Sequence, residues 1–228
     1  MSEINLNSNI SSCMITGVGN GAAQGTSERD LVNELIMLEW QAFDKVQNEG
    51  GRAACQDDYA TFSIMRRSQY ETWTDDMLAS FIDDFYSANE AGWNLITEKY
   101  ARMEESTAPA EYEKIKESLP PVSDKKAAIV DQIAGIQVDW MEEFAARYPK
   151  AAANARSIRR ETDTETNTSY ETYLRGELMT YSDKTLALYG QFIVKLAGNG
   201  ENLAVKIMEN TASYYGYASL DAMEASLG

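Results

Sequence analysis

The spacing of apolar residues is the feature that most constrains this fold. From residue 30 onward they recur every three or four positions, and no segment alternates convincingly between apolar and polar residues. That period is typical of amphipathic helices, whereas a half-buried strand needs alternation. Thr74 and Ser182 each precede Asp, as helix N-caps do, and Gly-Gly at 50–51 and Pro-Pro at 120–121 interrupt the pattern. We therefore predict an all-α fold. The predicted helices span 29–48, 58–73, 75–104, 109–118, 124–148, 168–181, 183–197, 201–217 and 219–226.

The chain also resembles itself at a fixed offset. WTDDMLASF at 73–81 aligns with YSDKTLALY at 181–189, and the same offset places AGWNL at 91–95 on NGENL at 199–203. Identities are sparse, but aromatic residues, caps and the Gly-x-Asn-Leu turn stay in register. This favours a direct duplication, although two amphipathic hairpins could also converge on such a pattern.

The duplication predicts a particular organisation of the chain. We expect a helical bundle built from two pseudo-repeated three-helix units, at about 29–104 and 124–217. Both belong to a single helical domain of residues 30–228. Residues 1–29 are rich in Ser, Asn and Gly and have no period, which predicts a flexible N-terminal arm.

Charge and hydropathy narrow the function classes. The 36 acidic and 20 basic residues give a net charge of −16. Such a surface repels nucleic-acid phosphates and anionic lipid headgroups, so we expect neither nucleic acid nor a membrane surface as a partner. No apolar run resembles a signal peptide or a membrane span. Cys13 and Cys55 are therefore expected to be reduced thiols in a cytoplasmic protein, without a disulfide.

The sequence contains no histidine. This excludes Ser-His-Asp triads, Cys-His dyads, HExxH zinc sites and di-iron sites built on Glu-x-x-His. Acid–base chemistry would have to use Glu, Asp, Lys, Tyr or Cys. A metal held by this chain would need mostly oxygen ligands, which suits Mg or Mn, although no such site is favoured.

The most informative residues are polar ones placed on apolar helix faces. Glu39 lies in the middle of the apolar arc of the first predicted helix, and Gln137 takes the same place in the helix from residue 124. Gln69 and Glu177 lie within two further stripes of apolar and aromatic residues. A carboxylate removed from water must be protonated, paired with a cation or bound to a ligand. Each predicted unit thus contributes one Glu and one Gln to the interior.

Two interpretations of these residues remain open. In the first, Glu–Arg and Gln–Tyr hydrogen bonds only fix the packing of the helices. In the second, the residues line a polar pocket, in which Glu39, Glu177 and Tyr173 are catalytic candidates. The candidates for substrate binding are Gln69, Gln137, Arg66, Arg175 and Tyr181.

The pocket interpretation has two functional forms. An enzyme would be a small-molecule lyase or hydrolase, in which one Glu with a raised pKa acts as base. The other Glu would stay charged beside an Arg that also holds an anionic substrate group. The alternative is a non-catalytic module that binds a metabolite or a protein partner.

Four segments resemble a known bacterial family. They are EWQAFDKVQNEGGRAACQDD at 39–58, FSIMRRSQ at 62–69, NLITEKYARM at 94–103 and TSYETYLRGELMTYS at 168–182. In this order they resemble the DUF-4125 family, a domain of unknown function, from residue 30 to about 220. The resemblance implies a compact helical domain and brings no established activity.

Overall fold

The computed structural model describes residues 30–48, 51–153 and 155–227, and within these ranges the regular structure is helical. The described residues contain no β-strand, only an isolated bridge between Thr164 and Asn167. The predicted all-α class is therefore confirmed. The predicted arm and Cys13 lie outside the described residues. The α-helices are α1 (Leu31–Asp44), α2 (Tyr59–Tyr70), α3 (Asp75–Glu90), α4 (Leu95–Thr107), α5 (Pro109–Ile115), α6 (Asp124–Arg147), α7 (Pro149–Ala152), α8 (Tyr170–Thr180), α9 (Asp183–Gly198), α10 (Leu203–Tyr214) and α11 (Leu220–Ser226).

The helix starts follow from their capping residues. The Thr74 side chain accepts a hydrogen bond from the backbone N–H of Met77, and the Ser182 side chain accepts one from Thr185. Both predicted N-caps are confirmed. Each satisfies a backbone donor that has no partner within the first turn of its helix.

The predicted helix 75–104 is wrong, because the chain forms two helices there. Gly92 has a φ of +70°, a left-handed conformation that ends α3. Two residues later, Asn94 accepts hydrogen bonds from the backbone N–H groups of Ile96 and Thr97 and starts α4 in a new direction. The apolar period continues across this corner, so periodicity alone does not reveal it.

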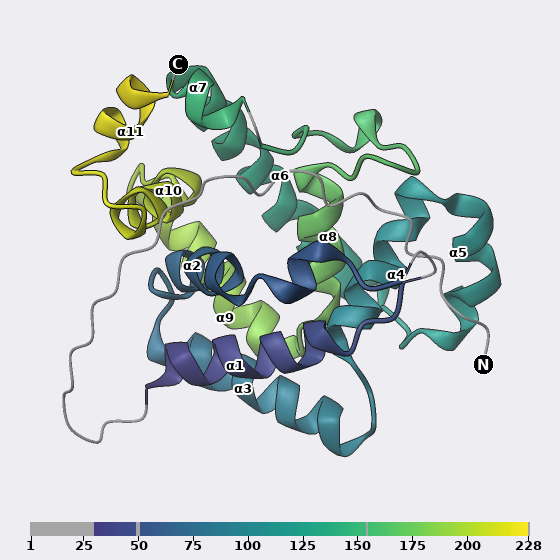
Figure 1. Cartoon of the computed structure of the whole chain (residues 1–228). Coiled ribbons are helices and arrows are strands. Elements are labelled where there is room, and N and C mark those ends of the chain that lie inside the picture. The colour runs from purple at the N-terminus through teal and green to yellow at the C-terminus, as the bar shows by residue number, and fades with distance from the viewer. Residues whose placement is uncertain (1–29, 49–50, 154, 228) are drawn as a thin grey trace.

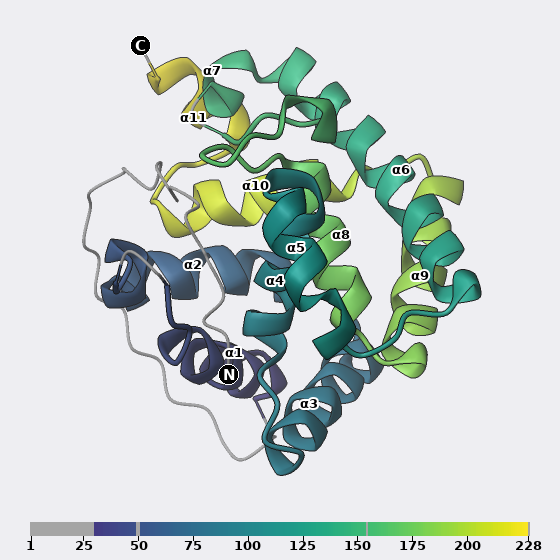
Figure 2. The same cartoon turned by 90° about the vertical axis from the view of Figure 1, so that its right-hand side faces the viewer.

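Helices α4 and α8 lie side by side in the middle of the molecule, as Figure 2 shows. Helix α1 packs on α4 from one side and α6 packs on α8 from the other. Helices α3 and α9 contact each other, and α2 and α10 contact each other to the left of α8 in the view of Figure 1. Helices α1 and α6, from distant parts of the sequence, therefore flank the α4–α8 pair.

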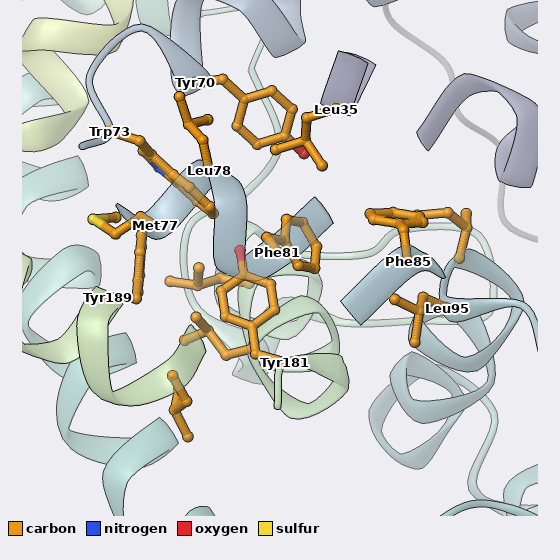
Figure 3. Close-up of a cluster of buried hydrophobic side chains, with 14 of the residues drawn as sticks. Leu35, Tyr70, Trp73, Met77, Leu78, Phe81, Phe85, Leu95, Tyr181 and Tyr189 are labelled. Atoms are coloured by element: carbon orange, nitrogen blue, oxygen red, sulfur yellow. The ribbon is translucent and has the colours of Figure 1, made fainter. Parts of the chain in front are cut away.

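The main hydrophobic core is rich in aromatic residues. Trp73 contacts the rings of Tyr70, Phe81, Tyr181 and Tyr189, at centroid distances of 5.2 to 6.1 Å (Figure 3). These rings come from the ends of α2 and α8 and from α3 and α9. Their apolar bodies fill the core, and the tyrosine hydroxyls carry polar groups into it.

Helix α4 is buried on nearly all sides and carries several charged residues into the interior. Glu98 accepts hydrogen bonds from Arg102 Nε at 2.8 Å and from Trp93 Nε1 at 2.6 Å. Its next residue, Lys99, points into the interior with 1% of its surface exposed. None of the helices in the described ranges combines the length and the apolar character needed to cross a membrane.

Candidate functional site

Glu39 brings the first carboxylate into the interior. It sits on α1 with only 2% of its surface exposed. Its Oε2 accepts a hydrogen bond of 2.5 Å from the hydroxyl of Tyr70, and its Oε1 lies 2.7 Å from Arg66 Nη2. Arg66 and Tyr70 lie four residues apart on α2, so both reach the same carboxylate from one helix face.

Glu177 on α8 brings the second carboxylate. Its Oε2 lies 2.5 Å from Lys99 Nζ and 3.5 Å from Arg66 Nη1. Its Oε1 accepts hydrogen bonds from the Tyr181 hydroxyl at 3.1 Å and from Gln69 Nε2 at 3.3 Å. Arg66 therefore joins the two carboxylates, one to each end of its guanidinium group.

Gly176 allows Lys99 to come this close to Glu177. A Cβ atom at position 176 would lie 2.9 Å from the carbonyl oxygen of Lys99 and 2.9 Å from Cγ of Met103. Only glycine lets α8 approach the backbone of α4 so closely. Lys99 on α4 can therefore contact the Glu177 carboxylate on α8 within the interior of the protein.

Tyr173 completes the group. Its hydroxyl accepts a hydrogen bond of 3.3 Å from Arg66 Nη2, and Lys99 Nζ lies 3.6 Å from its ring centroid. The ring is half-buried, unlike the fully enclosed Lys99. We call the five linked side chains the carboxylate network: Glu39, Arg66, Lys99, Tyr173 and Glu177.

The two carboxyl groups differ in proton affinity. Burial raises the pKa of Glu39, and this effect exceeds the opposing attraction of Arg66. Burial acts the same way on Glu177, but Lys99 and Arg66 overcome it and lower the pKa of this carboxyl to about 2. One carboxyl group thus holds its proton more firmly than usual, while the other stays charged.

The two cations of the network also change the proton affinity of the Tyr173 phenol. Burial opposes the ionisation of Tyr173, but the charges of Lys99 and Arg66 outweigh it and lower its pKa. Burial raises the pKa of Tyr70 and Tyr181 well above the usual value. Among these three phenols of the site, Tyr173 is therefore the one suited to give up a proton.

Comparison with known protein families gives a match over nearly all of the described residues. A family model described as "Protein of unknown function (DUF4125)" matches residues 29–225. The chain belongs to the DUF4125 family. Neither the comparison with curated proteins nor that with solved structures gives a match. The resemblance seen in the sequence is thus confirmed, and the chemistry of this DUF4125 domain has to be argued from its own residues.

Not all the residues singled out in the sequence lie in the carboxylate network. Glu39, Arg66, Tyr173 and Glu177 are members of it. Gln69 and Tyr181 bind Glu177 directly.

Gln137 is also buried, but two tyrosines separate it from Glu177. Its Oε1 accepts a hydrogen bond of 3.0 Å from Tyr189, whose ring contacts that of Tyr181. Within the described residues its Nε2 has no hydrogen-bond partner. Gln137 is thus linked to Glu177 through two tyrosines and does not touch either carboxylate.

Arg175 lies elsewhere, at the contact between α8 and α6. It binds Glu171 at 3.0 Å and also pairs with Asp131. It is two residues from both Tyr173 and Glu177, and side chains two apart on a helix point to different faces. The sequence-based suggestion that Arg175 binds substrate at this site therefore has no support in the geometry.

Sequence reasoning missed Lys99 and Tyr70. Lys99 shares a helix face with Leu95, Ile96 and Met103, all of which are buried. The criterion that singled out Glu39, a charged residue among apolar neighbours on one face, would have found Lys99 as well. In the sequence Tyr70 follows Gln69 directly and resembles any core aromatic residue. Only the structure shows that its hydroxyl lies 2.5 Å from Glu39.

No cluster of three or more Asp, Glu or Cys residues with the geometry of a metal site occurs in the described parts of the chain. In the carboxylate network the positive charge comes from Arg66, which contacts both carboxylates, and from Lys99, which contacts Glu177. A divalent ion would have to displace a salt bridge of 2.5 to 2.7 Å to reach them. The network suits acid–base chemistry with protein groups better than it suits Mg or Mn.

Proposed function

We propose that the carboxylate network is an acid–base site that acts on a small molecule as a lyase or hydrolase. The observation that supports this most is the pair of buried carboxyl groups that share Arg66 and differ in pKa. Two carboxyl groups with separated pKa values supply a proton-transfer group and a fixed charge within one site.

Each carboxyl group takes one of these roles. Glu39 is the proton-transfer group, because burial keeps its pKa above the usual value. Glu177 stays ionised and holds Lys99 over the ring of Tyr173. Tyr173 then serves as the second proton-transfer group, since Lys99 and Arg66 stabilise its phenolate.

The half-buried members indicate where a substrate would arrive. Arg66, Gln69 and Tyr173 retain some exposure, whereas Glu39 and Lys99 are enclosed. A small molecule would therefore meet Tyr173 and Arg66 first, with Glu39 behind Arg66. We place this reaction in the cytoplasm, in a domain of residues 30–228.

The rival function is a binding or scaffold module, and one observation favours it. All four oxygens of Glu39 and Glu177 lie close to protein donors. A fully paired buried network can specify helix packing without any chemistry. The two functions predict different effects of a change at Glu39. In an acid–base site the change should abolish turnover, whereas in a scaffold it should affect only stability.

We further propose that the chain arose by duplication, with α1–α4 related to α6 and α8–α10. Helices α3 and α9 both have 16 residues, and each is followed by a glycine with positive φ, Gly92 at +70° and Gly200 at +68°. Asn94 and Asn202 then cap α4 and α10. This order of elements supports a common origin for the two halves.

The two capping asparagines also make equivalent contacts. Asn94 Nδ2 donates to the carbonyl of Ala42 at 2.8 Å, and Asn202 Nδ2 donates to that of Trp140 at 2.9 Å. Ala42 lies three residues after Glu39, and Trp140 lies three residues after Gln137. The carboxylate of one half thus corresponds to the amide of the other, as the sequence pattern predicts.

The acid–base proposal is tested with the full chain and a panel of small hydroxy, amino and keto acids. Compounds that raise the melting temperature are then assayed for turnover. Glu39→Gln keeps the shape and most hydrogen bonds, so we expect a folded protein that has lost turnover. Glu142→Gln, at an exposed carboxylate paired with Arg159, is the matched control. If Glu39→Gln equals wild type in melting, ligand stabilisation and turnover, Glu39 takes no part in the reaction and the acid–base proposal is wrong.

A further inference from the structure

Tyr173 is surrounded by cations. Lys99 Nζ lies 3.6 Å from its ring centroid, Arg156 Cζ lies 5.0 Å from the same centroid, and Arg66 donates to its hydroxyl. In the described parts of the chain no carboxylate accepts a hydrogen bond from Tyr173. Three positive groups around one ring are unexpected in a protein with a net charge of −16.

Arg156 differs from the other two cations. Arg66 and Lys99 are committed to Glu39 and Glu177, but no carboxylate of a described residue lies within 4.0 Å of Arg156. Its one described hydrogen bond runs from Nη1 to the carbonyl of Thr168, at 3.2 Å. The residue is half-buried, and within the described residues its remaining donors are left for a further acceptor.

We propose that Arg156 and the half-buried ring of Tyr173 form the entrance of the site and bind a carboxylate group of the substrate. This inference rests on the proposed acid–base function and names the substrate class, a small organic monocarboxylate. The carboxylate would neutralise the charge of Arg156, and the remainder of the substrate would then lie beside the Tyr173 hydroxyl.

Two features favour a carboxylate over a phosphate. The planar guanidinium fork binds either anion through two parallel hydrogen bonds, and Nε and Nη2 of Arg156 can form such a pair because its described bond to Thr168 uses Nη1. The Phe62 ring lies 5.8 Å from the guanidinium carbon of Arg66 and supplies an apolar neighbour for an organic chain. A phosphate dianion would also meet stronger repulsion from the acidic protein.

The test is a titration of the full ¹⁵N-labelled chain with sodium propionate at constant ionic strength, following the Arg Nε–H signals by NMR. We expect a saturable shift of the Arg156 signal. Arg156→Gln should weaken binding about tenfold or more, because a charge-assisted bidentate contact is lost. Arg159→Gln removes the same charge three residues away, from a side chain that pairs with Glu142, and should leave binding within about twofold of wild type. Arg156→Lys keeps the charge without the planar fork and should bind with intermediate affinity.

Three results would overturn the inference. They are an absence of saturation up to about 50 mM propionate, unchanged affinity in folded Arg156→Gln and Arg156→Lys, and phosphate binding at Arg156 as tight as propionate. Propionate binding does not use Glu39, so Glu39→Gln should bind it normally. An anion site that persists while Glu39→Gln retains turnover would contradict the acid–base function and leave the binding site in place.

Discussion

Lys99 and Glu177 form an ion pair with 2.5 Å between Nζ and Oε2, across the contact between α4 and α8. Both side chains are buried, so neither charge has water as an alternative partner. Lys99 also lies 3.6 Å from the ring centroid of Tyr173. The pair therefore connects the packing of the two central helices with the proton affinity of the phenol.

Removing one partner of this pair should be costly, and removing both should cost less. Lys99→Met leaves the Glu177 carboxylate with the weaker contact to Arg66, and Glu177→Leu leaves Lys99 enclosed without a counter-ion. Each is expected to lower the free energy of unfolding by about 3 kcal/mol. The double variant should recover at least about 1 kcal/mol relative to the sum of the single changes. Urea denaturation of the four proteins measures this, and strict additivity would show that the pair is not coupled.

The depressed pKa of Glu177 predicts a pH dependence of stability. The carboxyl has a pKa of about 2 when folded and about 4.5 when unfolded, so its stabilising contribution is complete above pH 4.5 and is lost as the pH falls toward 2. Over this window wild type should lose about 3 kcal/mol more than Glu177→Gln. Melting curves from pH 2 to 7 test this. A constant difference between the two proteins across the whole range would contradict the charged state of Glu177.

Glu39 should act in the opposite sense. Its folded pKa lies above 4.5, so its ionisation disfavours the folded state as the pH rises from 4.5 through that folded pKa. Glu39→Gln removes this ionisation. We expect the melting temperature of the variant to gain on wild type as the pH rises through this window. A gain only below pH 4.5 would show that Glu39 is charged in the folded protein under all conditions.

Gly176 should be intolerant of even a methyl group. Its Cβ would lie 2.9 Å from the Lys99 carbonyl, and a backbone atom can yield only if α4 and α8 move apart. Gly176→Ala is therefore expected to cost about 1–3 kcal/mol. Gly135→Ala is the matched control, since nothing lies within 4 Å of its Cβ position in α6. That change should stabilise by about 0.5–1 kcal/mol through helix propensity. Equal effects of the two changes in chemical denaturation would remove the role assigned to the close helix contact.

Helical periodicity predicts much of this fold because almost every helix has one apolar face. Glu39 and Glu177 could be found from sequence as charges on such faces. Their partners could not all be found in this way. Helix α4 is enclosed on nearly all sides, so its polar residues point to several different neighbours, and a single-helix pattern cannot assign Lys99 to Glu177.

Proximity in sequence was misleading for the arginines. Arg175 is two residues from Glu177 but faces Asp131 and Glu171, whereas Arg66 reaches Glu177 from another helix. Arg156 gave no sequence signal, because it lies in the segment between α7 and α8, where no period defines a face. Contacts that depend on how distant segments pack cannot be derived from the local pattern.

The duplication predicts that Asn94 and Asn202 are energetically equivalent. Each caps a helix with its Oδ1 and fixes the carbonyl of a neighbouring helix with its Nδ2. Asn94→Ala and Asn202→Ala should each cost about 1–2 kcal/mol, because a cap and an interhelical hydrogen bond are lost together. Ser219→Ala, at a cap of α11 without such a described interhelical bond, should cost less. Equilibrium unfolding of the three variants measures the costs, and a large cost for only one asparagine would weaken the case for equivalent halves.

Tyr173 should lose its proton more readily than the phenols around it. Although burial opposes this ionisation, the charges of Lys99 and Arg66 lower the pKa of this phenol below its usual 10. Burial raises the pKa of its neighbours Tyr70, Tyr100, Tyr181 and Tyr189 well above that value. In a titration followed by ultraviolet absorbance near 295 nm, Tyr173 should therefore ionise ahead of these four neighbours, below pH 10. Tyr173→Phe should remove this first step, and Lys99→Met should move it to higher pH.

Tyr181→Phe is the matched control, because it removes a buried phenol bound to Glu177 and should leave the early step in place. If the first step survives in Tyr173→Phe, the early phenol is a different one, and the proton-transfer role assigned to Tyr173 is lost with it.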